Sequence, residues 1–389
     1  MKNSATNLHV LEESIFAQMT QKAITHKAVN LAQGFPTLGV PLIVKDSFQK
    51  ALQVDENHQY APFQGVLSFR QQISLYYKKF YDVTVDAGTE VLVTHGATQA
   101  IYLTLMGLID KGDEVVVFSP HYESYLPALK MLGANIKEYL LTGPDFALEE
   151  EKLNTIITSK TKLVIFNNPH NPSGRVFTAK ELTFLAQAVR RSGCFLLSDE
   201  VYEFLTYGEE RHRCMGEFLS LEEGLLICSS MGKTFGVTGH KIGHLISSSI
   251  LMKKLGLLQQ HQTFSVSKLA QMAFTYCLEG LEEYLPSFRQ LYGKQRKELM
   301  SLLAKNQLDF VIPEGSYFIL VDHREFEKKG IKSSSGKELC DILVTKHQLA
   351  AIPCHSFYLN SNSSEAQRYI RLCFAKESKT FKEIKILAH

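Results

Sequence analysis

Residues 229–243 read SSMGKTFGVTGHKIG, and this stretch decides how the rest of the chain is interpreted. Lys233 has mainly small and hydroxyl neighbours upstream, and a second cation, Lys241, follows further along. A lysine that acts as a nucleophile needs a lowered pKa, which burial and nearby positive charge provide. A solvated surface lysine is the alternative, and it describes most of the 42 lysines and arginines here. Lys233 is therefore a candidate whose role depends on the other motifs.

Short apolar runs alternate with longer helical patterns through the middle of the chain. Such runs are typical of strands covered on both faces, as in a mostly parallel sheet under helices. Asn171, Asp199 and Lys233 each come after such a run, and ligands of open α/β sheets bind at that C-terminal edge. The strands that we expect cover residues 90–94, 114–118, 161–166, 194–198 and 224–228, with a helix over about 98–109.

The pattern changes near residue 284. A long helix to about residue 305 comes first, followed by short strands near Phe318 and Leu349, a strand over 368–374 and a final helix. We therefore expect two domains. The large, cofactor-binding domain covers residues 30–283, and the smaller α+β domain combines residues 1–29 with residues 284–389.

Asp199 and Tyr202 lie together in the stretch SDEVY, residues 198–202. Asp199 follows an apolar run and is expected to be partly buried, so it needs a cationic partner. A protonated nitrogen in the ring of a bound cofactor would be such a partner, and Tyr202 could donate a hydrogen bond to a hydroxyl group on the same ring. A helix N-cap aspartate beside a packed tyrosine is an equally good interpretation of these residues alone.

Gly96, Ala97 and Thr98 connect an expected strand to an expected helix. Backbone N–H groups and the helix dipole there would face an anion, and Ser230 and Lys241 could add a hydroxyl and a charge. An ordinary strand-to-helix turn is the alternative. No G-x-G-x-x-G follows any strand, so a dinucleotide site has no support.

Arg371 lies inside the apolar stretch IRLCF, residues 370–374. An arginine in a buried strand must be paired or must bind something, and its planar fork of donors matches a carboxylate. A structural ion pair is as good an explanation. Asn171, between Pro169 and Pro172, is either a turn residue or a donor to a ring hydroxyl and a carboxylate.

Composition excludes several other classes of protein. The net charge is +2 with 21% charged residues, and no basic stripe or acidic tail suggests nucleic acid or a basic partner. No apolar run approaches the roughly 18 residues that span a bilayer, and residues 1–20 lack the core of a secretory signal. The seven cysteines are odd in number and dispersed, so reduced thiols, a cytoplasmic location and no metal site are expected.

Taken together, these motifs fit a site that holds pyridoxal 5'-phosphate on a lysine, and the chain resembles the fold-type I, class I/II aminotransferases. Within them it is similar to the kynurenine–glutamine transaminase and bacterial methionine aminotransferase group. The resemblance covers nearly the whole chain and implies a large domain with a mostly parallel seven-stranded sheet. It is carried by NLAQGFP (30–36), NHQYAP (57–62), THGATQA (94–100), NNPHNPSG (167–174), SDEVY (198–202), SSMGKTFGVTGHKIG (229–243), PEGSYF (313–318) and RLCFAK (371–376).

The same resemblance implies a role for each matching residue. Lys233 would bind the cofactor as a Schiff base and shuttle a proton, and Asp199 would pair with the pyridine nitrogen. Asn171 and Tyr202 would bind the ring hydroxyl, while Tyr122 stacks on the ring. The phosphate would be held by Ala97, Thr98, Ser230 and Lys241, with Tyr60 from the partner subunit of a homodimer, and the substrate carboxylate by Gly34, Asn171 and Arg371.

Some residues depart from the family pattern. His240 stands where relatives commonly have Trp, His244 where they have an aromatic ring, and Lys241 where many have Arg. No arginine lies between Arg213 and Arg289, although dicarboxylate-specific relatives would be expected to carry one near residues 262–266.

The resemblance therefore implies transamination of a neutral, apolar amino acid, methionine or aromatic, with a 2-oxo acid by a ping-pong mechanism. Phe35, Phe264 and Phe357 are candidate pocket residues, with core packing as the alternative for each. Two rival functions stay open: β-elimination of cysteine S-conjugates on the same scaffold, and a non-catalytic regulatory domain that retains the cofactor. Sequence alone fixes neither the preferred donor and acceptor nor the pathway.

Overall fold

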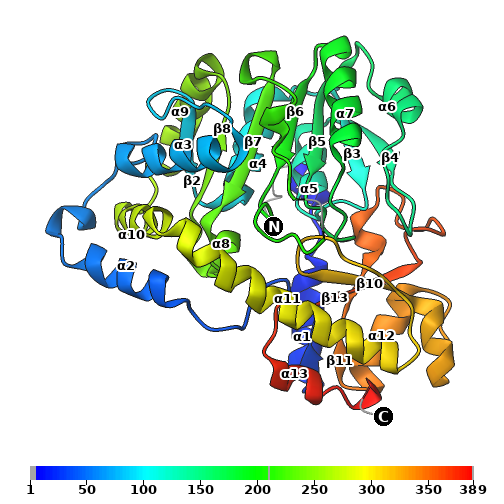
Figure 1. The fold of residues 1–389 in the computed structure, drawn as a ribbon. Coiled ribbons are helices and arrows are strands. Elements are labelled where there is room, and N and C mark those ends of the chain that lie inside the picture. The colour runs from blue at the N-terminus through cyan, green and yellow to red at the C-terminus, as the bar shows by residue number, and fades with distance from the viewer. Residues whose placement is uncertain (1–5, 209–210, 388–389) are drawn as a thin grey trace, which may run out of the picture.

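A seven-stranded sheet forms the centre of the molecule (Figure 1). The computed structural model describes residues 6–208 and 211–387, so residues 1–5 and 388–389 of the expected small domain lie outside the described residues. In this sheet β8 alone runs antiparallel to its neighbours, which confirms the predicted α/β fold with a mostly parallel sheet. The strand order is β2 (Val91–Thr94), β8 (Gly243–Ile246), β7 (Leu225–Ser230), β6 (Phe195–Asp199), β5 (Thr161–Asn167), β3 (Glu114–Ser119) and β4 (Asn135–Leu140).

The central strands follow the apolar runs of the sequence. All residues of β7 and nearly all of β5 are buried, as expected for strands covered on both faces. Two strands of this sheet were not predicted: β4 alternates polar and apolar residues at the sheet edge, and the short β8 contains a glycine and a histidine. One placement is corrected, because Asp199 is the last residue of β6 and not the residue after it; Lys233 follows β7 as expected, within the one-turn helix α8 (Met231–Thr234).

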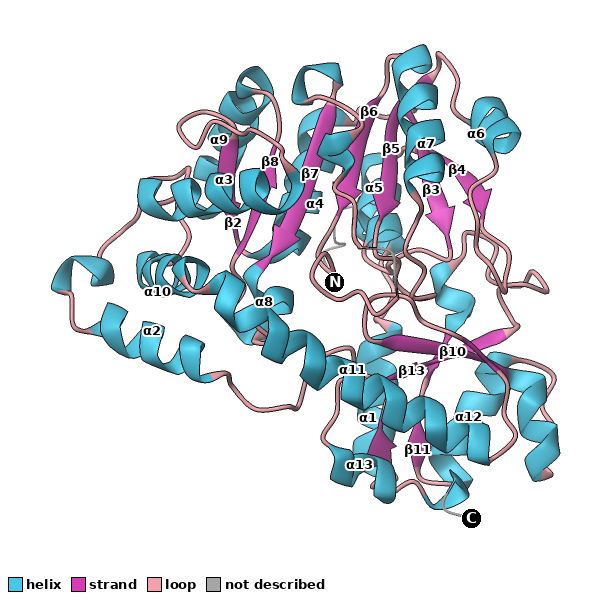
Figure 2. Ribbon diagram, viewed as in Figure 1, coloured by secondary structure: helices cyan, strands magenta, loops and turns pink. Residues whose placement is uncertain are grey.

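Helices cover both faces of this sheet (Figure 2). Helix α7 shows the sequence signals clearly, since Thr178 and Glu181 form a capping box at its start and Gly193 ends it with a φ of 69°. Helix α4 begins at Gly96 and packs on β7 and β8. The helices of this part are α2 (Leu42–Leu52), α3 (Leu67–Tyr81), α4 (Gly96–Leu108), α5 (Tyr125–Leu132), α6 (Glu150–Ile156), α7 (Ala179–Ser192), α9 (Ser249–Thr263) and α10 (Lys268–Glu279).

The C-terminal part forms two smaller sheets below the first. A four-stranded sheet has the order β12 (Ile352–Pro353), β13 (Tyr369–Cys373), β10 (Phe318–Asp322) and β9 (Phe310–Val311), while β1 (Val29–Asn30) pairs with β11 (Leu349–Ala350). Helix α1 (Ile15–Thr25) contacts β11 and α12, so the two ends of the chain pack together (Figure 1). The division into domains 30–283 and 1–29 plus 284–389 stays a prediction. The remaining helices are α11 (Leu281–Lys305), α12 (Gly336–Lys346) and α13 (Ser378–Lys382).

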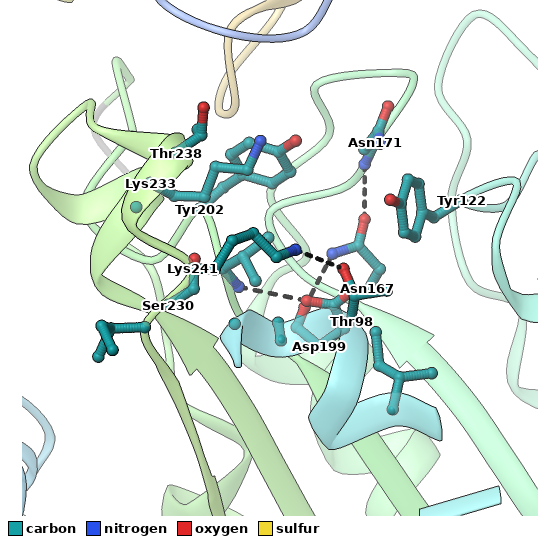
Figure 3. Close-up of a pocket in the computed structure, with 16 residues that line it drawn as sticks. Thr98, Tyr122, Asn167, Asn171, Asp199, Tyr202, Ser230, Lys233, Thr238 and Lys241 are labelled. Carbon is teal, nitrogen blue, oxygen red and sulfur yellow. Dashed lines mark hydrogen bonds between the residues drawn. The ribbon is translucent and has the colours of Figure 1, made fainter. Parts of the chain in front are cut away.

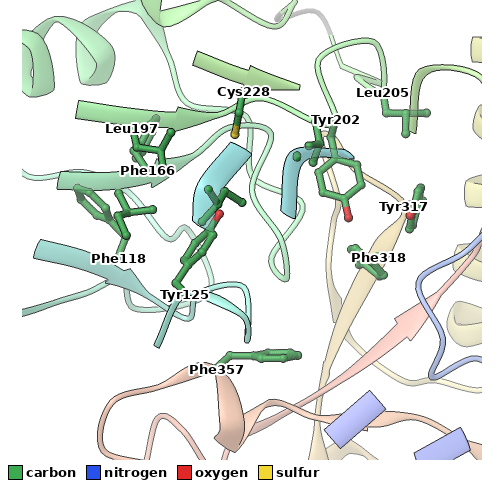
Figure 4. Close-up of a cluster of buried hydrophobic side chains, with 14 of the residues drawn as sticks. Phe118, Tyr125, Phe166, Leu197, Tyr202, Leu205, Cys228, Tyr317, Phe318 and Phe357 are labelled. Carbon is green, nitrogen blue, oxygen red and sulfur yellow. The ribbon is translucent and has the colours of Figure 1, made fainter. Parts of the chain in front are cut away.

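One hydrophobic core joins the two parts of the molecule. Figure 4 shows it running from Phe118 and Phe166 of the large sheet to Tyr317 and Phe318 at the start of β10. Tyr317 and Phe318 are both fully or almost fully buried. Residues of the C-terminal part therefore pack in the same core as residues of the large sheet.

All seven cysteines are buried and free. Across residues 6–208 and 211–387, no helix combines the length and the apolar character that crossing a membrane requires. A cytoplasmic location stays a prediction. Within the same described ranges, no three His, Cys, Asp or Glu side chains gather as a metal site would need.

Candidate active site

A cavity opens where β5, β6 and β7 end, at the carboxyl edge of the sheet (Figure 3). Loops after β3 and β5 and the starts of α4 and α8 complete its wall. Nearly every residue predicted to bind the cofactor lines this cavity. Those residues are Ala97, Thr98, Tyr122, Asn171, Asp199, Tyr202, Ser230, Lys233 and Lys241.

Lys233 reaches into the cavity from α8, directly after β7. Its Nζ donates a hydrogen bond to the Tyr317 hydroxyl at 2.6 Å and lies 3.4 Å from the carbonyl oxygen of Gly34. The pKa of Lys233 is lowered to about 8, mainly because the amine is desolvated; the charge of Arg371 contributes to the lowering, and Cys373 and Asp199 oppose it. A minor but far larger fraction of this amine than of an exposed lysine is therefore unprotonated and nucleophilic near neutral pH.

Asp199 ends β6 at the floor of the cavity. Its Oδ2 accepts a hydrogen bond of 2.6 Å from the Tyr125 hydroxyl, and its side chain is 4% exposed. Burial raises the pKa of Asp199 to about 6, while the hydrogen bond from Tyr125 opposes that rise. Among the described residues, the side chain of Asp199 accepts hydrogen bonds from the Tyr125 hydroxyl and the Val201 N–H and forms no ion pair, although the charge of Lys233 acts on it from further away. A buried carboxylate without a cation is costly, so the site fits a positively charged ligand atom here.

The start of α4 forms a cradle for an anion. Gly96 has a φ of 70°, and His95 before it makes no side-chain cap, so the first N–H groups of this 13-residue helix lack such a partner. Lys241 Nζ lies 3.5 Å from the Thr98 hydroxyl. Gly243 lets β8 approach this turn closely, because a Cβ there would lie 2.6 Å from the carbonyl carbon of Gly96.

Arg371 of β13 is buried, with 1% of its surface exposed, and stands beside the cavity. It donates a hydrogen bond of 2.7 Å to Asn171 Oδ1, and the Asn171 N–H in turn donates to Asn167 Oδ1 at 2.7 Å. Its Nε has no partner, and no ion pair joins Arg371 to a carboxylate in the described part of the chain. The structural ion pair considered from the sequence is therefore absent among these residues, and the guanidinium is available to a ligand.

Gly34 lies next to Arg371, since a Cβ on Gly34 would be 3.8 Å from the Arg371 Nη2 atom. Tyr60 is different: its side chain is 81% exposed, packs edge-on against Phe264, and does not line the cavity of its own chain. Of the candidate pocket residues, Phe357 is buried beside Arg371, whereas Phe35 and Phe264 are about half exposed.

Neither unusual histidine lines the cavity. His240 is exposed and stacks on Phe48, with ring centroids 4.2 Å apart. His244 is fully buried in β8, and its Nε2 lies 3.1 Å from the hydroxyls of both Tyr76 and Tyr77. Burial lowers the pKa of His244 to about 3, so it stays neutral and belongs to the packed interior behind the site.

Several further polar residues of the site were not singled out from the sequence, among them Thr238, which lines the cavity. Tyr125 contacts Asp199, Asn167 donates a hydrogen bond of 2.8 Å to the Asp199 carbonyl, and Tyr317 accepts one from Lys233. Asn167 and Tyr317 lie within motifs that carry the resemblance, which was the available signal. Tyr125 sits in an ordinary helical stretch and offered none.

The residues present fit pyridoxal phosphate. The uncapped start of α4 with Lys241 suits a phosphate, the lone buried carboxylate of Asp199 suits a protonated ring nitrogen, and the partly deprotonated amine of Lys233 suits an aldehyde. Each of these groups would otherwise be a buried or unpaired polar group with an energetic cost. One bound molecule that carries a phosphate, a protonated ring nitrogen and an aldehyde would provide partners for all of these protein groups at once.

Comparisons with known proteins agree with this geometry. The profile of the family "Aminotransferase class I and II" matches residues 26–385. A methionine aminotransferase from Escherichia coli is 33% identical over 375 residues, which make up 96% of this chain and 95% of that protein. Human kynurenine–oxoglutarate transaminase 3 is 31% identical over 399 residues, covering 97% and 88%. A solved structure of the E. coli methionine aminotransferase superposes with a TM-score of 0.92 at 32% identity, over 100% of both chains.

Proposed function

The chain belongs to the class I and II aminotransferases, and from that premise we propose that it moves the amino group of a neutral, apolar amino acid to a 2-oxo acid. Enzymes of this family depend on pyridoxal phosphate. The transfer takes place in two half-reactions, so that the first product leaves before the second substrate binds. Neither the lyase nor the regulatory alternative is favoured, because the similar proteins described above are transaminases.

One observation carries this proposal. A partly buried lysine amine that lines the cavity and a buried arginine without a carboxylate partner among the described residues both lie next to Gly34. An α-amino acid carries an amine and a carboxylate on one carbon. A site that binds the carboxylate on Arg371 therefore brings the α-carbon toward the amine of Lys233.

We assign the remaining roles from the same geometry. Arg371 binds the substrate carboxylate through its fork of N–H donors, and Asn171 orients that fork. Asp199 is held ionised by Tyr125 and pairs with the pyridine nitrogen, while Tyr202 donates to the ring hydroxyl and Tyr122 covers the ring. Ala97, Thr98, Ser230 and Lys241 hold the phosphate.

Pyridoxal phosphate, when bound, supplies an electron sink that lets the α-carbon of the substrate lose its proton. Lys233 accepts that proton on Nζ and delivers it again within the same site. Its lowered pKa of about 8 suits both steps, because general acid–base catalysis is most efficient when the pKa is near the working pH.

Aromatic side chains around Arg371 support an apolar substrate. The rings of Phe318, Phe16 and Phe357 lie with their centroids 3.9, 5.0 and 5.3 Å from its guanidinium carbon. They make the surroundings of Arg371 apolar, and a second carboxylate would lose its hydration in such surroundings. The names of the similar proteins, a methionine aminotransferase and a kynurenine–oxoglutarate transaminase, agree with such a substrate.

A panel of amino acids tests the substrate class. We expect methionine and phenylalanine to react with a kcat/KM at least about tenfold above that of aspartate and glutamate, because an unpaired carboxylate is costly to bury. The measurement follows the change in cofactor absorbance together with 2-oxo acid formation, and Lys233→Ala serves as the blank. A preference for aspartate or glutamate would overturn the assignment. Ammonia released from a cysteine S-conjugate without any 2-oxo acid acceptor, faster than transamination, would support the lyase instead.

We also propose that the active unit is a homodimer in which Tyr60 completes the partner's phosphate site. Helix α2 and the segment with Tyr60 project outward from the molecule (Figure 1), and these segments together with α3 and α9 carry exposed large apolar side chains. Their exposure is costly in a free monomer, and a second copy would cover them. They are Val40, Leu42, Leu52, Val54, Tyr60, Leu67, Leu75, Ile250, Leu257 and Phe264.

Mixing two inactive variants tests this shared site. Lys233→Ala and Tyr60→Ala proteins are unfolded together, refolded and assayed, with each variant refolded alone as the control. A mixed dimer contains one intact site if Tyr60 acts on the partner, so we expect the mixture to exceed the sum of the two controls. No gain in activity, although sedimentation shows that mixed dimers form, would contradict the proposal.

A further inference from the structure

Tyr317 joins Lys233 to the loop that contains Gly34. Its hydroxyl accepts the hydrogen bond of 2.6 Å from Lys233 Nζ and donates one of 2.6 Å to the carbonyl oxygen of Gly34. The Lys233 Nζ atom is also 5.2 Å from the centre of the Tyr317 ring and 5.4 Å from that of Tyr202. The amine thus stands in a pocket made of two acceptor oxygens and two aromatic rings.

The direction of these hydrogen bonds matters. Because Tyr317 gives its proton to Gly34, its lone pairs face the amine of Lys233. Burial raises the pKa of Tyr317 well above its ordinary value, so the phenol keeps this proton at every working pH. An amine that meets only acceptors and ring faces is stabilised more as the ammonium than as the free base.

The ring of Tyr317 has little freedom to turn away. It is fully buried and packs edge-on against Tyr202 at 5.2 Å and against Phe318 at 4.7 Å, with Tyr292 stacked at 6.2 Å. Phe318 is the next residue in the chain, whereas Tyr202 and Tyr292 come from two distant segments. The hydroxyl therefore offers a fixed acceptor rather than an adjustable one.

We propose that Tyr317 is a positioning residue that holds the ε-amine of Lys233 beside Gly34 and Arg371 whenever that amine is not bonded to the cofactor. This inference rests on the proposed function. A lysine that is displaced when substrate binds must stay within reach of the α-carbon if it is to move the proton. The contact with Tyr317 keeps it there, on the side where the substrate carboxylate binds.

Several charged and titratable groups act on the same amine. Asp199 and Cys373 raise the pKa of Lys233, and Arg371 and Lys241 lower it. None of these residues is altered by a change at Tyr317. A shift in the titration of Lys233 that follows loss of the Tyr317 hydroxyl is therefore due to that contact.

The test compares Tyr317→Phe with Tyr292→Phe, both in the cofactor-free full-length chain. Tyr292 is equally buried but does not contact the amine, so it is the matched control. Lys233 is modified by an amine reagent across a range of pH, and the modified peptide is quantified by mass spectrometry. The pH at which modification of Lys233 is half-maximal reports the titration of its amine. We expect this midpoint to fall by about one pH unit in Tyr317→Phe, the size expected for a hydrogen bond to a charged group. In Tyr292→Phe it should stay unchanged.

The cofactor-loaded enzyme gives a second readout. In Tyr317→Phe we expect kcat to fall by about tenfold, within the range for general acid–base catalysis, while KM for the amino acid changes little. An unchanged midpoint in Tyr317→Phe, or an equal shift in Tyr292→Phe, would overturn the proposal. If Tyr317→Phe does not fold, Tyr317→Met removes the hydroxyl and refills the space. If the midpoint shifts as expected but the cofactor-loaded wild-type enzyme shows no transamination, the proposed function is wrong, while the contact between Tyr317 and Lys233 is still supported.

Discussion

Lys233→Ala is expected to lower the kcat of transamination by about 10²- to 10⁴-fold, the usual contribution of a positioned acid–base group. The variant should also lose the visible absorbance that depends on a covalent link between the lysine and pyridoxal phosphate. Two lysines, Lys233 and Lys241, line the cavity in the described part of the chain, and this variant removes the one that follows β7 directly. Steady-state kinetics and an absorbance spectrum measure both effects.

Lys241→Ala is the matched control, because it removes a lysine from the same cavity at the phosphate end. This variant should bind the cofactor more weakly but keep the covalent absorbance and, at saturating cofactor, much of its kcat. An unchanged spectrum in Lys233→Ala would show that another residue holds the cofactor. If Lys233→Ala and Lys241→Ala lost the absorbance of the covalently bound cofactor to the same extent, Lys233 would not be the residue that specifically carries the covalent link.

Arg371→Lys is expected to lower kcat/KM for the amino acid by about 30- to 1000-fold, which corresponds to about 2–4 kcal/mol for a buried charge pair. Lysine keeps the charge but replaces the planar fork by a single ammonium group, so only one of the two carboxylate oxygens is well bound. The hydrogen bond to Asn171 at 2.7 Å would also be lost or displaced. Most of the effect should appear in KM, since the carboxylate is bound in ground state and transition state alike.

Arg296→Lys is the control for this change. Arg296 is another partly buried arginine, but it donates to the carbonyl of Pro313 and lies over the ring of Tyr207, away from the cavity. Its replacement should cost stability without changing the KM for the amino acid. Similar kinetic losses in both variants would mean that Arg371 acts through the fold and not through the substrate.

Much of the site could be predicted because its residues follow strands. Asp199 ends β6, Lys233 follows β7 by one helical turn, and Asn171 follows β5, so parallel strands bring them to one edge. The apolar runs of β5, β6 and β7 are strong signals for buried strands. Arg371 stood out for a related reason, since an arginine in an apolar strand needs a partner.

The contacts between distant segments could not be predicted. Tyr125 meets Asp199 and Tyr317 meets Lys233 across more than seventy residues of sequence, and local pattern carries no information on such distances. Strand β8 was missed because Gly243 and His244 weaken its strand propensity, although the sheet needs it to approach α4. His244 had suggested an altered site, yet it packs with Tyr76 and Tyr77 in the interior.

The central claim is that Lys233 carries pyridoxal phosphate as an aminotransferase nucleophile. Reduction of the cofactor-loaded protein with borohydride would fix the link, and peptide mass spectrometry would locate it. We expect the reduced cofactor on the peptide that contains Lys233, and its loss when methionine is added before the reduction. An adduct on another lysine, or none on a protein that binds the cofactor, would contradict the account.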